Sequence, residues 1–261
     1  MTLLDLIEKI TPCVLEAGNI IMDVYKRGPN VEFKHDGSPV TQADSAAEEI
    51  IITELKKLVP NILIISEENA ASHYKSAEKR FLLVDPLDGT KEFLKKDGKG
   101  YFTVNISLIE NNTPSMGIVY APALDQMFFG CKSFGAWKTV NGESKKISTR
   151  TVQKNEFIAM TSISHLDLET TNWLKKNNIT STKSIGSSLK FCLLACGQAD
   201  VYPRFGPTME WDTAAGDAIL RAAGGIVLKP NFLPFKYGKH FYKNDPFIAW
   251  GDSRIKEENN H

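Results

Sequence analysis

The stretch FLLVDPLDGTKEF, residues 81–93, is the most informative part of this chain. Its four apolar residues 81–84 predict a buried strand. Two carboxylates, Asp85 and Asp88, follow at the strand end, separated by a proline and a leucine. Such a pair alone also fits an exposed acidic turn. Burying both acids is costly without a counter-charge, and a divalent cation with oxygen ligands is the simplest one. The stretch therefore predicts a magnesium site, with the Leu87 carbonyl as a further ligand.

Two more acidic segments stand at the ends of predicted elements. NILIISEEN, residues 61–69, is an apolar strand that ends in Glu67 and Glu68. MEWDTAAGDAIL, residues 209–220, places Asp212 in the first turn of a helix whose small residues permit close packing. Asp212 alone would also fit a helix N-cap. Three acidic clusters that each lie at an element end are expected to converge on two or three cations.

The residues after Asp88 predict an anion site beside the metal. Gly89 and Thr90 are expected to begin a helix whose free N–H groups point at a phosphate. Hydrolysis of a phosphate ester needs neutralised phosphoryl oxygens, an in-line water and a stabilised leaving group, which two cations roughly 3.5–4 Å apart supply. Metal and phosphate at one place favour a phosphatase.

The hydrophobic pattern divides the chain into two predicted domains, residues 1–150 and 151–261. The first reads as α+β, with two amphipathic helices followed by a meander of strands, and the second alternates strands and helices as in an α/β domain. The boundary lies near the end of the polar, turn-rich segment 140–150. Helices are expected at 3–25, 42–58, 167–177, 188–197 and 212–224; strands at 62–65, 81–84, 101–109, 116–120, 127–131, 135–139, 157–160, 183–185, 200–202 and 225–228.

Composition excludes several classes of partner. The 261 residues contain 31 Lys plus Arg and 31 Asp plus Glu, so no global field recruits nucleic acid or a membrane surface. No apolar window approaches the roughly 18 residues of a membrane span. The four cysteines form no zinc pattern and are expected to be reduced thiols of a cytoplasmic protein.

The acidic motifs, taken in order, resemble the inositol monophosphatase superfamily of magnesium-dependent, lithium-sensitive phosphatases. Its pattern is an acid after one strand, DPxDGT after the next and WDxAAG near the C-terminus, and all three stand here. The resemblance covers nearly the whole chain. It implies a layered α-β-α-β-α sandwich, and it also allows a peripheral location at the inner membrane.

Two longer segments are similar to one branch of this superfamily. DPLDGTKEF and GSSLKFCLLACGQADVYPRFGPTMEWDTAAG, residues 186–216, resemble the 3'(2'),5'-bisphosphate nucleotidases. The implied reaction is hydrolysis of the 3'-phosphate of adenosine 3',5'-bisphosphate, a by-product of sulfate assimilation, to AMP and phosphate. One departure is visible: where Ser-Arg-Ser-His is expected, residues 162–165 read Ser-Ile-Ser-His. The missing arginine affects phosphate or ribose contacts and leaves the chemistry intact.

The resemblance also implies the metal ligands. Glu67 and Asp85 would bind one magnesium ion, and Asp85, Asp88 and Asp212 would bind another, with two or three ions in each active site. Adjacent side chains of an extended segment point to opposite faces. Glu68 is therefore expected to reach a metal only through water.

The attacking water is assigned to Thr90 together with Asp44. A threonine hydroxyl is a poor base alone, but a carboxylate partner makes it an oriented acceptor for a water whose pKa a cation has lowered. Asp44 lies in VTQAD, at the start of a predicted helix, so helix capping is its alternative role. Asp36, in KHDGSPV, is the competing candidate for the partner of Thr90 or for an outer third metal.

Substrate selection is expected from the second domain. A glycine before two serines at the start of a helix, in GSSLK at 186–190, makes an anion cradle. Lys190 and Arg204 add positive charge for a second phosphate, and arginine suits bidentate contact. Ordinary surface ion pairs are the alternative for both. His165 is a candidate to stack on the adenosine. The expected substrate-binding residues are Gly89, Thr90, Ser187, Lys190, Arg204 and His165.

Two other functions remain open at this point. An inositol monophosphatase or a fructose-1,6-bisphosphatase would use the same metal core, although the segment from GSSLK to YPRFG argues against both. A non-catalytic module that binds a divalent cation such as calcium usually draws its ligands from one loop or adjoining loops. Here the acids are spread from Glu67 to Asp212 and include a threonine suited to hydrolysis.

Overall fold

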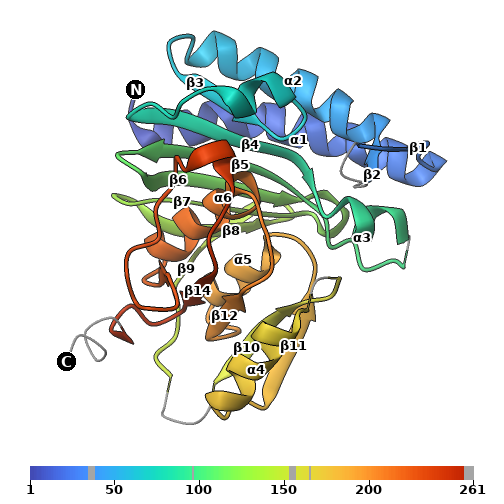
Figure 1. The fold of residues 1–261 in the computed structure, drawn as a ribbon. Helices are drawn as coiled ribbons and strands as arrows, with labels where there is room; N and C mark the ends of the chain where they lie inside the picture. Colours follow the sequence, from blue (N-terminus) through green and yellow to red (C-terminus); the bar gives the residue numbers. More distant parts are fainter. Residues whose placement is uncertain (35–38, 96, 153–156, 165, 256–261) are drawn as a thin grey trace.

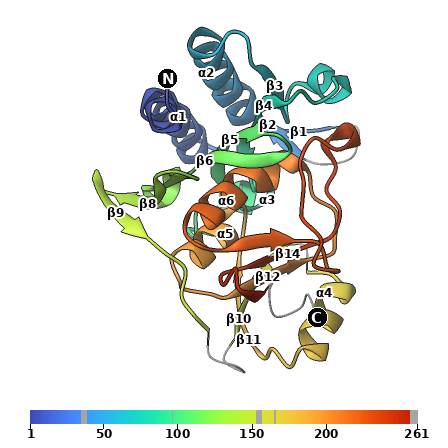
Figure 2. The same ribbon diagram turned by 90° about the vertical axis from the view of Figure 1, so that its left-hand side faces the viewer.

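Two large β-sheets, one small two-stranded sheet and three helical layers form the protein, as the computed structural model shows for residues 1–34, 39–95, 97–152, 157–164 and 166–255 (Figures 1 and 2). The first sheet has the order β3-β4-β5-β6-β7-β8-β9 and the second the order β11-β10-β12-β14-β13. The strands of the first sheet are β3 (Leu63–Ser66), β4 (Arg80–Asp88), β5 (Thr103–Glu110), β6 (Thr113–Ala121), β7 (Gln126–Cys131), β8 (Gly135–Val140) and β9 (Glu143–Ile147). Those of the second are β10 (Ile158–Ser162), β11 (Ser181–Ile185), β12 (Val201–Arg204), β13 (Ile226–Leu228) and β14 (Phe247–Trp250).

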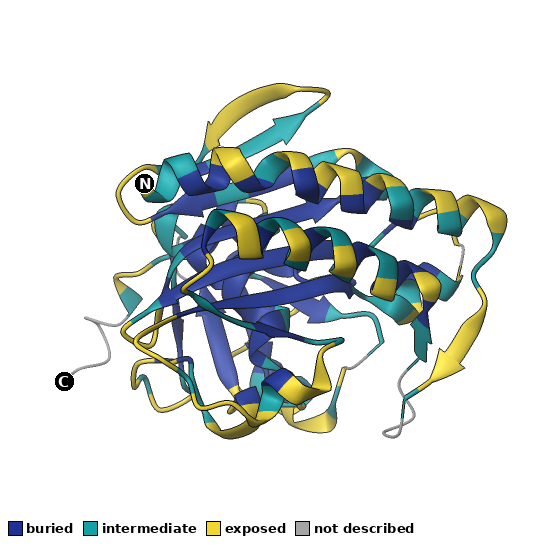
Figure 3. Cartoon of the chain, turned by 90° about the horizontal axis from the view of Figure 1, so that it is seen from above, coloured by how far each residue is buried: buried dark blue, intermediate teal, exposed yellow. Residues whose placement is uncertain are grey.

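The outer helical layer consists of α1 (Leu3–Arg27) and α2 (Gln42–Leu58). Each helix begins with a capping box, formed by Thr2 and Asp5 in α1 and by Thr41 and Asp44 in α2. The threonine hydroxyl accepts a hydrogen bond from a backbone N–H of the first turn, and the aspartate accepts one from the threonine N–H. Their apolar stripes face the first sheet, and their polar faces stay exposed (Figure 3). A short hairpin, β1 (Val31–Phe33) and β2 (Pro39–Thr41), connects them.

The middle layer holds α6 (Glu210–Ala222) and α5 (Leu189–Ala195) between the two sheets (Figure 1). Small residues allow a close approach here, as the sequence predicts. A Cβ on Gly117 of β6 would lie 2.3 Å from the Ala215 carbonyl oxygen, and one on Gly216 would lie 2.6 Å from the ring of Phe191. A larger residue at either glycine would force α6 away from its neighbours, and Asp212 would move with it.

The central strands β12 and β14 of the second sheet are buried on both faces, whereas the edge strand β11 is mostly exposed. Tyr202, Phe247 and Ala249 pack with α5 and α6, whereas Val201 and Ile248 pack with Leu174 of α4 (Leu168–Lys176), the last helical layer. The layer order is thus helix, sheet, helix, sheet, helix, and the expected α-β-α-β-α sandwich is confirmed.

Some sequence-based boundaries were wrong. Segment 140–150 was expected to be a turn-rich connection, but it contains β9, whose side chains are mostly exposed and carry no apolar alternation. The strand expected at 81–84 continues to Asp88, because β4 keeps pairing with β5 beyond an irregularity between Asp85 and Asp88. The chain leaves the first sheet at Ile147 and enters the second at Ile158. Division into two domains at residue 150 stays a prediction.

Candidate metal centre and phosphate pocket

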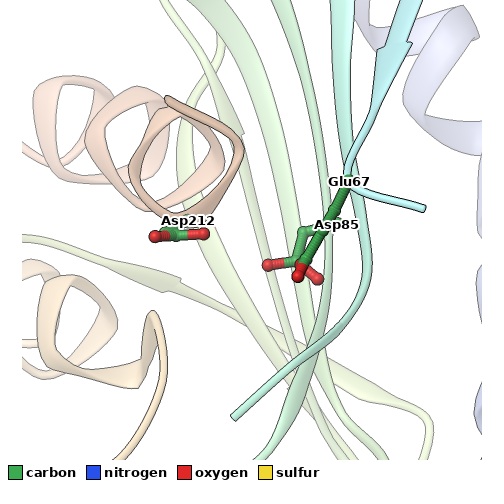
Figure 4. Close-up of side chains that lie close together, drawn as sticks. All are labelled: Glu67, Asp85 and Asp212. Carbon is green, nitrogen blue, oxygen red and sulfur yellow. The ribbon is translucent and has the colours of Figure 1, made fainter. Parts of the chain in front are cut away.

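Three acids converge where the two halves of the chain meet. One carboxylate oxygen from each of Glu67, Asp85 and Asp212 lies within 4.8 Å of the other two. Glu67 and Asp85 extend from neighbouring parallel strands, and Asp212 approaches from the start of α6 (Figure 4). The parallel register, in which Ser66 pairs with Val84, places the next residue of each strand side by side. This register, together with the packing of α6, builds the cluster.

Asp85, the most deeply buried acid of the cluster, forms no ion pair with a lysine or arginine among the described residues. Asp85 is 1% exposed, and its Oδ2 atom is buried with no hydrogen-bond partner among the described residues. Burial raises the pKa of Asp85 well above its usual range, and the charges of Glu67, Asp88 and Asp212 raise it further. Burial and the charges of Asp88 and Glu67 likewise raise the pKa of Asp212. A hard divalent cation fits this set of oxygen donors.

Asp88 lies beside the cluster and joins it to the second half of the chain. A regular strand sends side chains three residues apart to opposite faces, but the irregularity in β4 adds one residue between Asp85 and Asp88. Asp88 Oδ2 accepts from the Ser188 N–H at 2.7 Å. Burial raises the pKa of Asp88 to about 6, against the opposing charge of Lys190.

Lys34 pairs with two of the acids, a contact that the sequence analysis missed. Its Nζ lies 2.8 Å from Glu67 Oε1 and 2.7 Å from Glu68 Oε1. Glu68 thus binds a lysine and is absent from the three-acid cluster, in keeping with its expected lesser role. Burial and the charge of Glu67 raise the pKa of Glu68 to about 7. Lys34 is the first residue of the segment KHDGSPV, but nothing around it in the sequence points to its partners, which lie 33 and 34 positions away.

Thr90, Asp44 and Leu87 meet on the other side of the acids. The Thr90 hydroxyl lies 3.5 Å from Asp44 Oδ1 and 3.2 Å from the Leu87 carbonyl oxygen. Asp44 Oδ2 accepts from the N–H and hydroxyl of Thr41, both at 2.8 Å. One oxygen of this carboxylate therefore caps α2, and the other faces Thr90, so the role of Asp44 as the partner of Thr90 stays a prediction. Asp36 lies outside the described residues.

A pocket of about 250 Å³ opens in front of these groups. Its first wall carries Glu67, Asp88, Gly89 and Thr90, and its second carries residues of the C-terminal half. Thr90 is the first residue of the short helix α3 (Thr90–Lys95), as expected. The described residues of the second wall include Ser162, Gly186, Ser187, Lys190, Tyr202, Arg204, Thr208 and Asp212. A larger, mainly apolar cavity of about 640 Å³ lies beside α1 and contains none of the expected site residues.

Lys190 and Arg204 are buried in this pocket, whereas the surface ion pairs considered as an alternative would leave their side chains exposed. Lys190 donates to the Ser187 carbonyl at 2.5 Å and lies over the Tyr202 ring, and burial lowers its pKa to about 8. Arg204 donates to the carbonyls of Gly206 and Pro207. Ser187 adopts a positive φ of 51°, and its hydroxyl is buried without a partner in the described part of the chain. His165 lies outside the described residues.

The comparisons with known proteins agree with this architecture. Residues 5–249 match the inositol monophosphatase family. The protein therefore belongs to this family of metal-dependent phosphatases. The 3'(2'),5'-bisphosphate nucleotidase CysQ of Salmonella typhimurium is 47% identical over 225 residues, which cover 85% of this chain and 89% of that protein. The protein of the same name from Escherichia coli is 44% identical with the same coverage. The expected likeness to the nucleotidase branch is confirmed.

Solved structures show the same fold. The crystal structure of CysQ from Bacteroides thetaiotaomicron has a TM-score of 0.78 at 38% identity and covers 93% of this chain, with 95% of its own length matched. An IMPase from Thermotoga maritima also reaches 0.78 at 25% identity, over 97% of this chain and 94% of that one. Among the described residues, no helix has the length and apolar character needed to span a bilayer.

The raised pKa values predict an unusual pH dependence of stability without metal. Asp85, Asp88 and Asp212 keep protons that the unfolded chain releases near pH 4, so the stability they contribute falls as pH rises. In EDTA, the unfolding temperature should drop between about pH 5.5 and 8 by at least roughly 2–4 °C, the shift that 1 kcal/mol produces at this size. Calorimetry at both pH values tests this, and saturating magnesium should reverse the trend. An unfolding temperature that stays constant or rises in EDTA would contradict it.

Proposed function

We propose that the protein is a magnesium-dependent phosphatase that hydrolyses the 3'-phosphate of adenosine 3',5'-bisphosphate to AMP and phosphate. Such a reaction would recycle a by-product of sulfate assimilation. The observation that carries the proposal is one pocket that is lined both by acids of the cluster, Glu67 and Asp212, and by the buried cations Lys190 and Arg204. The names of the close relatives support the same substrate.

The acids have the role of binding the metal. Glu67, Asp85 and Asp212 offer converging oxygens, the charge of Asp88 acts on Asp85, and the Leu87 carbonyl oxygen lies 3.2 Å from the Thr90 hydroxyl. Carboxylate and carbonyl oxygens suit Mg²⁺, and a family-type site would hold two or three ions. When bound, Mg²⁺ neutralises the phosphoryl oxygens and lowers the pKa of the attacking water.

Thr90 and Asp44 position that water. The hydroxyl of Thr90 can donate its proton toward Asp44, which leaves its lone pairs to accept from the water. The buried Asp44 keeps its orientation because Thr41 donates twice to its other oxygen. The pair thereby fixes the direction from which water approaches the phosphorus atom.

The second wall holds the part of the substrate that is not cleaved. Lys190 and Arg204 supply positive charge for the 5'-phosphate, and Ser187 offers a free hydroxyl in the same pocket. An exchange of their present carbonyl contacts for phosphate contacts costs few hydrogen bonds and adds charge–charge attraction. With the 5'-phosphate held there, the 3'-phosphate is directed to the acids, and Gly89 and Thr90 border it.

A double-mutant cycle on the water-positioning pair tests the mechanism. With adenosine 3',5'-bisphosphate as substrate, Thr90→Ala should lower kcat roughly 100-fold or more, the usual contribution of a positioned proton acceptor. Asp44→Asn should act similarly, and the double variant should be little worse than either one, because the two act as a unit. Kinetics at saturating magnesium measure each value, with AMP identified by chromatography.

Two results would distinguish the alternatives. The Thr90→Ser variant keeps the hydroxyl and should recover most of the activity. Losses that multiply in the double variant would show that Asp44 is not the partner of Thr90 and would favour Asp36. Release of the 5'-phosphate in place of the 3'-phosphate would contradict the proposed orientation of the substrate.

A further inference from the structure

A short helix that follows Glu67 in the chain folds back on Ser66, the last residue of β3. In η1 (Ala70–Tyr74), the Ser72 hydroxyl oxygen accepts from the Ser66 N–H at 3.1 Å. The His73 Nε2 atom lies 2.8 Å from the Ser66 carbonyl oxygen. A carbonyl can only accept, so Nε2 carries the proton and donates. Both backbone polar groups of the residue before Glu67 are therefore held by η1.

The same histidine contacts the other half of the metal centre. Its ring stacks on the indole of Trp211, with centroids 4.6 Å apart and an interplanar angle of 27°. Trp211 directly precedes Asp212 in α6 and is only 4% exposed. Its Nε1 has no hydrogen-bond partner in the described part of the chain, so ring packing determines where this indole lies.

We propose that His73 is a positioning residue that fixes the distance between Glu67 and Asp212 for the cation. The two acids come from segments far apart in the sequence, yet their oxygens lie within 4.8 Å of each other. The His73 side chain contacts the residue before each of them, Ser66 by its N–H and Trp211 by its face. It thus bridges β3 and α6 behind the ligands. This inference rests on the metal site of the proposed function.

The loss of such outer partners typically weakens metal affinity or activity by about 10–100-fold. His73→Ala should therefore raise the Kd of the metal-free protein for Mg²⁺ by about tenfold, measured by isothermal titration calorimetry. Two further variants separate the contacts. His73→Phe keeps a ring on Trp211 and loses the donor, whereas His73→Gln keeps a donor and loses the ring. Each should lie between wild type and His73→Ala, and excess magnesium should restore most of kcat in all three.

Two neighbouring substitutions serve as controls. Tyr74→Ala alters the next residue, whose exposed ring contacts Phe241, and should leave the Kd within about twofold of wild type. Ser72→Ala loosens η1 from β3 without a direct effect on the Trp211 contact, so its effect on the Kd should be smaller than that of His73→Ala.

The outcomes separate this inference from the proposed function. An unchanged Kd in His73→Ala and His73→Phe, with only a lower unfolding temperature, would show a purely structural role and overturn the inference. A wild-type protein that binds no Mg²⁺ would overturn the proposed function itself. The Kd for Mg²⁺ should rise more in His73→Ala than in the Ser72→Ala control, by more than the loss of stability in that control explains. This result would support the bridge between β3 and α6.

Discussion

The substitution Asp85→Asn is expected to remove nearly all turnover while it raises the stability of the metal-free protein. Asp85 is the most deeply buried member of the acidic cluster. The negative charges of Glu67, Asp88 and Asp212 lie close enough to raise its pKa. Loss of a direct ligand should lower kcat by more than the roughly 10–100-fold that loss of an outer partner costs. Without metal, and at a pH high enough to ionise Asp85, the neutral amide relieves the repulsion among like charges, so the unfolding temperature in EDTA should rise.

Kinetics and calorimetry on the same preparation measure both effects. Asp125→Asn is a matched control, because Asp125 is an exposed aspartate outside the pocket and its positive φ of 47° tolerates asparagine. It should change neither quantity appreciably. An Asp85→Asn protein that retains turnover, or that unfolds at a lower temperature in EDTA, would contradict the assignment of Asp85 as a metal ligand.

The second large effect is the choice of substrate. Adenosine 3',5'-bisphosphate should exceed inositol 1-phosphate and fructose 1,6-bisphosphate in kcat/KM by about a hundredfold. Against inositol 1-phosphate, the physical reason is the second phosphate of the nucleotide, whose charge-assisted hydrogen bonds contribute roughly 2–3 kcal/mol. The family's inositol phosphatases share the metal core, so the discrimination has to come from the second wall of the pocket.

Neutral variants of that wall test the reason. Lys190→Met and Arg204→Gln should reduce the activity on the nucleotide more than any activity on inositol 1-phosphate. Both side chains are buried, so circular dichroism must first show that each variant folds. Lys145→Met on the exposed strand β9 is the control for a lost lysine. Equal losses on both substrates, or equal cleavage of them by wild type, would leave a metal phosphatase without the nucleotide preference.

Much of the fold follows from local sequence signals. Helix α2 has the bounds expected from its apolar stripe and capping box, and α1 extends only two residues beyond its expected end, because amphipathic period and caps act locally. The sequence analysis predicts neither of the exposed strands β1 and β9, because β9 has no apolar alternation and the three residues of β1 are too few to show a period. Pairing with a neighbouring strand, which is a tertiary effect, creates them.

In the candidate site too, residues with a local sequence signal could be predicted, and residues placed by tertiary contacts could not. The acids could be found because each lies at an end of a predicted helix or strand, and the structure brings Glu67, Asp85 and Asp212 together. Lys34 and His73 had no such signal, since their partners are distant in sequence or are backbone groups. The burial of Lys190 also depends on packing between the two sheets, which composition does not reveal.

The most direct test of the central claim is the release of phosphate from adenosine 3',5'-bisphosphate by wild-type protein, first in excess EDTA and then with magnesium added back. The account predicts no measurable hydrolysis in EDTA, full recovery with Mg²⁺, and AMP as the product. Hydrolysis that continues in EDTA would contradict a catalytic centre built on Glu67, Asp85 and Asp212.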